Sequence, residues 1–215
     1  SYMGTSFCYI LDRKTGEFVE HHRESLGKRA RVSRELWDDD CHFRKGNYRI
    51  EIRNRLSLGK HLVEIDIPAR KDTPAIQAEF EMLEDLDKVQ PLIPVLPIST
   101  NRPLHTHKAP CPVRGHIQLG QHRIELQEDR DIALLDVQKT YYPYNTLWKW
   151  ATCAGYTDAG KLIALNLVQN MIADDENFNE NALWVDDKLT PWSAARFQFD
   201  EADCMTPWNI ETTDG

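Results

Sequence analysis

Apolar and polar residues alternate strictly along several segments of the chain, and this alternation constrains the fold more than any other feature. The pattern is clear at residues 48–53, 63–67 and 76–82. Successive side chains of a β-strand point to opposite faces, so a period of two predicts strands with one face on a core and one in water. Helical periodicity is scarce. Residues 79–89 and 164–172 fit short helices, but they fit a strand followed by a loop equally well.

Short turn sequences separate the alternating segments. Residues 12–16, with the sequence DRKTG, lie between two apolar runs. An aspartate followed by a glycine at the end of such a segment is typical of a β-hairpin. Residues 120–121, 158–160 and 186–188 lie in equivalent positions later in the chain. Strands joined by short turns predict an antiparallel meander.

Prolines are concentrated near the middle of the chain, where six of the eleven lie between residues 91 and 112. Proline lacks the backbone N–H that a central strand donates, so we interpret residues 91–112 as a crossing or edge connection. This connection predicts two β lobes, residues 1–100 and 101–215. Both ends of the chain interrupt a strand pattern, so we expect each lobe to be partial.

Charge and composition argue against several classes of function. The formal net charge of −8 repels phosphate backbones, and acidic residues follow the basic cluster at residues 28–34, so we expect no nucleic-acid partner. The sequence has no apolar run of about 20 residues and no signal-peptide pattern, so we expect no membrane span and a cytoplasmic location. Five widely spaced cysteines without a C-x-x-C pair predict free, buried thiols in a reducing compartment.

Five of the six tryptophans lie in the second predicted lobe, which makes that lobe the candidate location of a functional site. Trp148 and Trp150 are two residues apart and therefore share one face of a strand, shortly after Tyr142. Two such indoles either fill a β core or form the wall of an enclosed ligand cavity. Both interpretations stay open from the sequence.

Polar residues within apolar runs supply further candidates. Asn166 interrupts residues 162–168, and a buried amide is either a clasp to a neighbouring strand or a polar point inside a cavity. Glu180 and Trp184 share one face of a predicted strand, and Asn181 lies on the other. A carboxylate beside a tryptophan can act as a general acid or lie in water at the start of the strand.

Metal and cofactor sites have little support in the sequence. His105 and His107 have the spacing that lets two imidazoles of a strand bind one metal, but no third ligand follows at a diagnostic distance. The sequence shows no phosphate-binding glycine loop, nucleophile elbow or Cys/His pair. We therefore predict no metal and no cofactor.

Several segments resemble the family catalogued as domain of unknown function 2804, and they occur in the expected order over nearly the whole chain. They are FCYILDRKTGEF (7–18), YPYNTLWKWATCAG (142–155), GKLIALNL (160–167), NENALWVDDK (179–188) and MTPWNI (205–210). The resemblance implies a lipocalin-like fold, distantly similar to the double barrels of carotenoid hydratases and tocopherol cyclases, which handle long apolar isoprenoids. It also implies additional segments at both ends, and it supplies no catalytic residues.

The hydratase-like members of that wider group offer one comparison of residues. They show an aspartate followed by histidine, then a Trp-Gly pair, ahead of a W-x-W strand. Here Asp136 occupies the aspartate position and Trp148-Lys149-Trp150 the aromatic strand. Val137 replaces the histidine, and the Trp-Gly pair is absent. The resemblance makes Asp136 a candidate general acid, while the missing histidine weakens the case for hydratase chemistry.

The sequence thus predicts an all-β, antiparallel, lipocalin-like barrel or sandwich of two lobes with few short helices. We predict that it binds an apolar small molecule in a cavity formed by Tyr142, Trp148, Trp150, Asn166, Asn181 and Trp184. The alternative is a lipid- or isoprenoid-modifying enzyme, of hydratase or cyclase type, with Asp136 or Glu180 as general acid. The sequence does not decide between the binding protein and the enzyme, and it does not indicate the oligomeric state.

Overall fold

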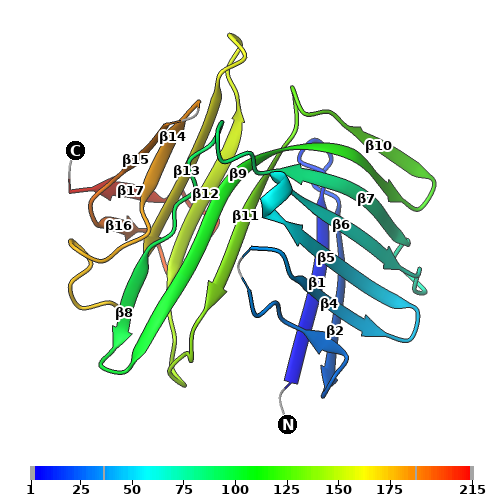
Figure 1. Ribbon diagram of the computed structural model, residues 1–215, viewed down its shortest axis with the longest axis horizontal. Coiled ribbons are helices and arrows are strands. Elements are labelled where there is room, and N and C mark those ends of the chain that lie inside the picture. Colours follow the sequence, from blue (N-terminus) through cyan, green and yellow to red (C-terminus); the bar gives the residue numbers. More distant parts are fainter. Residues whose placement is uncertain (1–2, 36, 187, 214–215) are drawn as a thin grey trace. The chain divides into compact units, whose positions relative to one another are not determined.

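The computed structural model describes residues 3–35, 37–186 and 188–213 (Figure 1). These residues form seventeen strands in antiparallel sheets and one short 3-10 helix, η1 (Leu56–Leu58), which confirms the predicted all-β class. Within these ranges none of the sheets closes on itself, and no helix has the length and hydropathy needed to cross a membrane.

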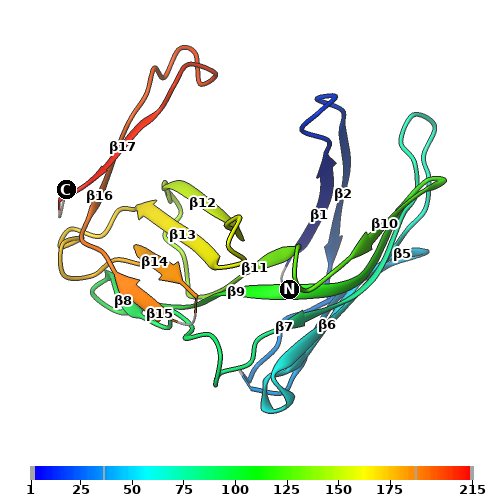
Figure 2. The same cartoon turned by 90° about the horizontal axis from the view of Figure 1, so that it is seen from above.

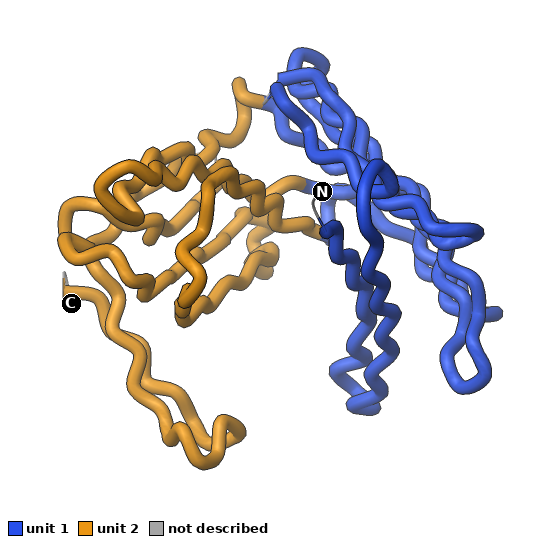
Figure 3. The backbone as a smooth tube through the Cα atoms, turned by 90° about the horizontal axis from the view of Figure 1, so that it is seen from below, with its two compact units in different colours: residues 1–85, 112–131 blue, residues 86–111, 132–215 orange. Residues whose placement is uncertain are grey.

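The chain divides into two compact units, each made of two chain segments (Figure 3). Unit 1 comprises Ser1–Asp85 and Pro112–Asp131, and unit 2 comprises Leu86–Cys111 and Ile132–Gly215. The long strand β9 (Arg102–Leu119) contributes residues to both units.

Unit 1 contains a sheet in the order β10-β9-β7-β6-β5-β4-β3 and a separate hairpin, β1–β2. The bounds are β1 (Met3–Leu11), β2 (Phe18–Leu26), β3 (Ala30–Arg31), β4 (Asp40–Lys45), β5 (Tyr48–Arg55), β6 (Lys60–Ile67), β7 (Ile76–Leu83) and β10 (His122–Leu126). Val19 of the hairpin packs with Phe43, Tyr48, Ile67 and Ile76 of the sheet. The hairpin is therefore a second layer over the sheet (Figure 2).

Unit 2 contains a four-stranded sheet in the order β12-β13-β14-β15, a hairpin of β16 and β17, and two strands, β8 and β11, that pair with β9. The bounds are β8 (Val95–Ser99), β11 (Ile132–Lys139), β12 (Lys149–Tyr156), β13 (Leu162–Gln169), β14 (Ala182–Val185), β15 (Lys188–Pro191), β16 (Ala195–Gln198) and β17 (Asn209–Thr212). The alternation of β13 and β14 directs Leu162, Ala164, Ala182 and Trp184 into one buried core cluster.

The predicted turns join consecutive strands. Gly16, between β1 and β2, has φ 75°, and its N–H donates to the carbonyl of Asp12 at 2.8 Å. Gly120 joins β9 to β10 with φ 57°, and Gly160 joins β12 to β13 with φ 76°. Glycine adopts these positive φ angles without steric cost, so a glycine in each turn sequence is a local signal that predicts the turn. Asp187, in the last predicted turn, lies outside the described residues.

The prediction that residues 91–112 form only a crossing or edge connection is wrong for residues 102–112, which belong to β9. Pro103 faces Pro97 of β8, and neither residue of this pair has a backbone N–H to donate. Pro110 and Pro112 lie between two pairings of β9. Lys108 forms a β-bridge with Leu92, and the pairing with β7 begins at Val113.

All five cysteines are free, as predicted, but their burial differs from the prediction. Cys111 of β9 is buried, whereas Cys153 and Cys204 are exposed, so the prediction of buried thiols is wrong for these two. Cys153 lies on β12, an outer strand of its sheet, on the side that faces water.

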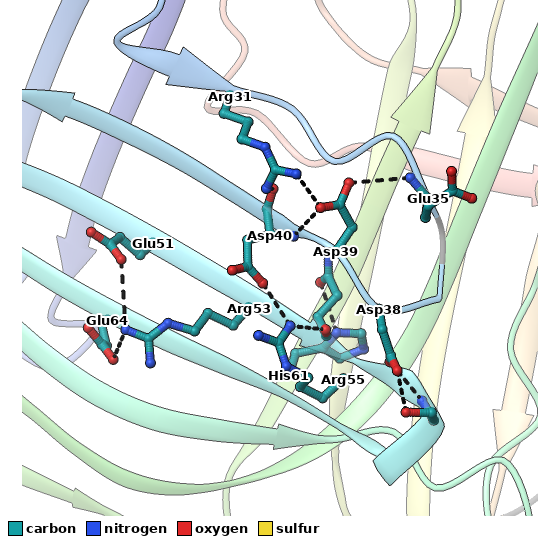
Figure 4. A network of polar contacts seen from close by, with 12 residues as sticks. Arg31, Glu35, Asp38, Asp39, Asp40, Glu51, Arg53, Arg55, His61 and Glu64 are labelled. Atoms are coloured by element: carbon teal, nitrogen blue, oxygen red, sulfur yellow. Dashed lines mark hydrogen bonds and ion pairs between the residues drawn. The ribbon is translucent and has the colours of Figure 1, made fainter.

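Ion pairs cover the polar face of unit 1 (Figure 4). Arg53 pairs with Glu64 at 2.8 Å across β5 and β6. Asp39 accepts hydrogen bonds from the backbone N–H of Arg34, at 2.7 Å, and from the guanidinium of Arg31. These bonds hold the pKa of the Asp39 carboxyl well below its usual range. The basic cluster is thus part of a surface network within the protein.

A buried polar network lies behind this face. The His61 imidazole lies 2.9 Å from Asn54 Oδ1 through Nδ1 and 2.7 Å from Glu84 Oε2 through Nε2. All three side chains are buried. Both ring nitrogens have partners, as a buried imidazole requires.

Gly115 of β9 provides a test of the close approach of β9 to β7. Its φ of 136° is a glycine conformation, and a Cβ there would lie 2.3 Å from the Glu79 carbonyl oxygen and 2.6 Å from the Phe80 Cα. Strain and overpacking together predict that Gly115→Ala lowers the free energy of unfolding by about 2–4 kcal/mol in urea denaturation. Gly155→Ala on β12, where a Cβ meets no atom within 4 Å, is the control. Equal urea midpoints for the two variants would contradict this account.

Candidate functional site

Unit 2 contains a cavity of about 130 Å³ with an apolar wall and a charged end. The apolar wall includes Trp148, Trp150, Val168 and Ile172, and the charged residues of the lining are Lys108, Asp136 and Glu180. These wall residues come from β13 and the residues that follow it, from the segment that leads into β12, and from the first residues of β12. Trp148 and Trp150 remain about half exposed, so this side of the cavity is open to water.

Lys108 organises the charged end. β9 carries Lys108, β11 carries Asp136, and Glu180 precedes β14. The Lys108 Nζ lies 2.9 Å from Asp136 Oδ2 and 3.1 Å from Glu180 Oε2. The side chains of Lys108 and Glu180 are only 4% and 2% exposed, whereas that of Asp136 is 26% exposed. Two buried charges therefore meet here, and they are stable only because they are paired.

The tryptophan wall is tied to the charged end through Asn166. The Trp150 indole N–H donates to Asn166 Oδ1 at 2.8 Å, and Asn166 Nδ2 donates to the Glu180 carbonyl at 2.6 Å. The Lys108 ammonium lies 5.2 Å from the centre of the Trp150 ring, a cation–π contact. Asn166 thus lies behind the wall and fixes both Trp150 and the backbone at Glu180.

Tyr142 lies on the open side of the cavity. Its ring stacks on that of Trp148, with the centroids 6.1 Å apart, and its hydroxyl donates to Gln138 Oε1. Gln138 Nε2 in turn lies 3.5 Å from Glu180 Oε2. Burial raises the pKa of Tyr142, and the negative charges of Glu180 and Asp136 raise it further. The guanidinium of Arg102 holds this segment by donating to the Tyr142 carbonyl at 3.2 Å.

The structure brings five of the eight candidate residues together at the cavity. They are Asp136, Tyr142, Trp148, Trp150 and Glu180. Asn181 does not line the cavity: its Oδ1 accepts from the Val168 N–H at 2.6 Å and its Nδ2 donates to the Ser193 carbonyl at 2.8 Å. Trp184 is fully buried in the core and donates its indole N–H to the Gln90 carbonyl at 2.8 Å.

Sequence reasoning missed Lys108 and Gln138. Lys108 stands in the buried segment 106–111 of β9, and it is the one charged residue of that segment. A lysine inside an otherwise buried run is a usable signal, because a buried ammonium requires a carboxylate partner. The clustered prolines obscured it, since they argued against any strand at this position.

The histidines singled out by their spacing do not form a metal cluster. His107 is buried and His105 is half-buried on β9. In residues 3–35, 37–186 and 188–213, no three His, Cys, Asp or Glu side chains lie close enough to hold a metal ion.

A protein-family model described as "Domain of unknown function (DUF2804)" matches residues 1–215, the whole chain. No curated protein and no solved structure is significantly similar to the chain.

Replacing Lys108 tests whether the charged end of the cavity holds unit 2 together. Lys108→Met leaves Asp136 and Glu180 without the positive charge between them, so we expect a loss of about 3 kcal/mol in the free energy of unfolding. The matched control is Lys161→Met, which removes an exposed ion pair to Asp186 at 3.6 Å and should change stability by less than about 0.5 kcal/mol. Urea denaturation measures the free energy of unfolding of both variants. Similar small losses in both would show that Lys108 is not essential to the fold.

Proposed function

The chain belongs to the DUF2804 family, whose function is unknown, and we propose that this member binds a small molecule with an apolar body in the cavity of unit 2. The observation that carries the proposal is the combination of an aromatic wall, Trp148 and Trp150, with the buried charged end at Lys108. Binding sites for small molecules are typically concave and mostly apolar, with a few placed polar groups that fix orientation.

The size of the cavity limits the ligand. Its volume of about 130 Å³ lies near that of the roughly 150 Å³ cavity that holds one benzene ring in an engineered protein core. A single ring or a short branched chain therefore fits. A longer molecule would place only one end inside and lay the remainder against the half-exposed faces of Tyr142 and Trp148.

The lipocalin-like resemblance supports the proposal, because folds of that kind enclose small ligands between β-strands. The polar contacts of the wall support it as well. Trp150 is fixed through Asn166 and Trp148 is stacked on Tyr142, so both rings are held in position before a ligand arrives. A pre-formed site loses less conformational entropy on binding.

The enzyme alternative has one observation in its favour, since both candidate acids, Asp136 and Glu180, reach the cavity. Two observations favour binding over catalysis on a long isoprenoid. The cavity is far smaller than the roughly 300–1,000 Å³ typical of sites for larger ligands. Both carboxylates are also held in ion pairs with Lys108, whereas a general acid must offer a proton to the bound molecule.

Trp148→Ala tests the proposed binding role. Trp148 is half exposed and precedes β12, so its removal opens the wall without disturbing a strand. With benzyl alcohol as the probe, we expect affinity to fall about tenfold because the aromatic contact is lost. Tyr144→Ala is the control, since Tyr144 is fully exposed in the same segment and does not line the cavity. Ligand-observed NMR measures the affinity. Equal affinity of the two variants for benzyl alcohol would overturn the proposal.

A further inference from the structure

We infer that the molecule bound in the unit 2 cavity is a small organic cation, an amine whose ammonium lies against Asp136 and Glu180 and whose apolar body lies against the aromatic wall. This inference rests on the proposed binding function and specifies the class of ligand. It follows from the charge balance of the lining, the aromatic side chains around it and the size of the space.

The charge balance of the cavity is negative. The charged residues of its lining are one lysine and two acids, which leaves one negative charge without a counterpart among the lining residues. Glu180 is almost completely buried, and an uncompensated charge at such a place is costly. A ligand with one positive charge would balance the site.

The carboxylates keep acceptor capacity for such a ligand. Lys108 binds Oδ2 of Asp136 and Oε2 of Glu180, and Gln138 also approaches Oε2. These contacts within the described residues use Oδ2 and Oε2, so Asp136 Oδ1 and Glu180 Oε1 are the oxygens that can accept from a ligand. An ammonium group has up to three N–H donors, so it could bind both of these oxygens.

The aromatic wall suits a cation. Tyr142, Trp148 and Trp150 line the cavity, and the Lys108 ammonium already lies over the face of Trp150 at 5.2 Å. The negative potential of an aromatic face attracts ammonium groups, most strongly for tryptophan and away from bulk water. The same faces provide apolar surface for the carbon atoms of an amine.

The electrostatic field at the open side has the matching sign. Burial raises the pKa of the Tyr142 hydroxyl, and the negative charges of Glu180 and Asp136 raise it further, so both acids act on a side chain that lines the cavity. Such a field attracts cations and repels anions. A fatty acid or another carboxylate is therefore the wrong class of ligand, although it would match the apolar wall.

Three probes of one shape test the inference on the whole chain. Benzylamine, benzyl alcohol and benzoate share a phenyl ring and differ in charge, and each is close to the size of the cavity. Isothermal titration calorimetry at pH 7 is expected to give benzylamine a dissociation constant about tenfold below that of benzyl alcohol, with benzoate weakest.

Substitutions of the two acids test whether the preference for benzylamine depends on their charges. Glu180→Gln and Asp136→Asn each remove one negative charge at nearly constant shape, so the preference for benzylamine over benzyl alcohol should fall about tenfold in each. Asp136→Asn is the safer variant for folding, because its side chain is partly exposed. The control is Glu201→Gln, an exposed acid outside the lining, which should keep the full preference. Circular dichroism checks that each variant is folded.

The outcomes separate this inference from the proposed function. Equal affinity for the three probes, or tightest binding of benzoate, would overturn the cation inference and leave the binding function in place. A benzylamine preference that survives both Asp136→Asn and Glu180→Gln would overturn it as well. If none of the three probes binds, the binding function and the inference both fail.

Discussion

Strand β9 must satisfy the backbone hydrogen bonds of 18 residues although three of them are prolines, and both units are built on this strand. It pairs with β8 near its start, with β11, and with β7 and β10 towards its end. Pro103 falls opposite Pro97 of β8, in a proline–proline pair. This one strand supplies residues to both units.

The same strand positions the candidate site. Residues 106–111 of β9 are buried, so Lys108 is placed in the interior of unit 2, and its ammonium has to be neutralised there. Asp136 from β11 and Glu180 from the segment before β14 reach it from two directions. Asn166 then links Glu180 to Trp150, so one buried charge orders the polar end and the aromatic wall together.

Particular elements show why sequence reasoning succeeded in some places and failed in others. The hairpin of β1 and β2 was readable because Asp12 and Gly16 act within five residues of each other. β9 was not, because the effect of a proline on a sheet depends on which strand lies beside it. The two roles considered for tryptophans, core and wall, both occur: Trp184 fills the core of unit 2, and Trp148 and Trp150 line the cavity.

The all-β class and the turns follow from the sequence alone, because alternation and glycine conformation are local properties of the chain, and the family follows from a match over the whole chain. It also indicated Asp136, Glu180, Tyr142, Trp148 and Trp150 as candidates. The packed strands reveal that these five side chains line one cavity and that Lys108 joins the two acids. This arrangement depends on long-range contacts such as that of Lys108 with Asp136, which are 28 positions apart in the sequence. No local sequence pattern records such a contact. Burial of an ammonium between two carboxylates is a property of the packed strands, and it gives the site its charge.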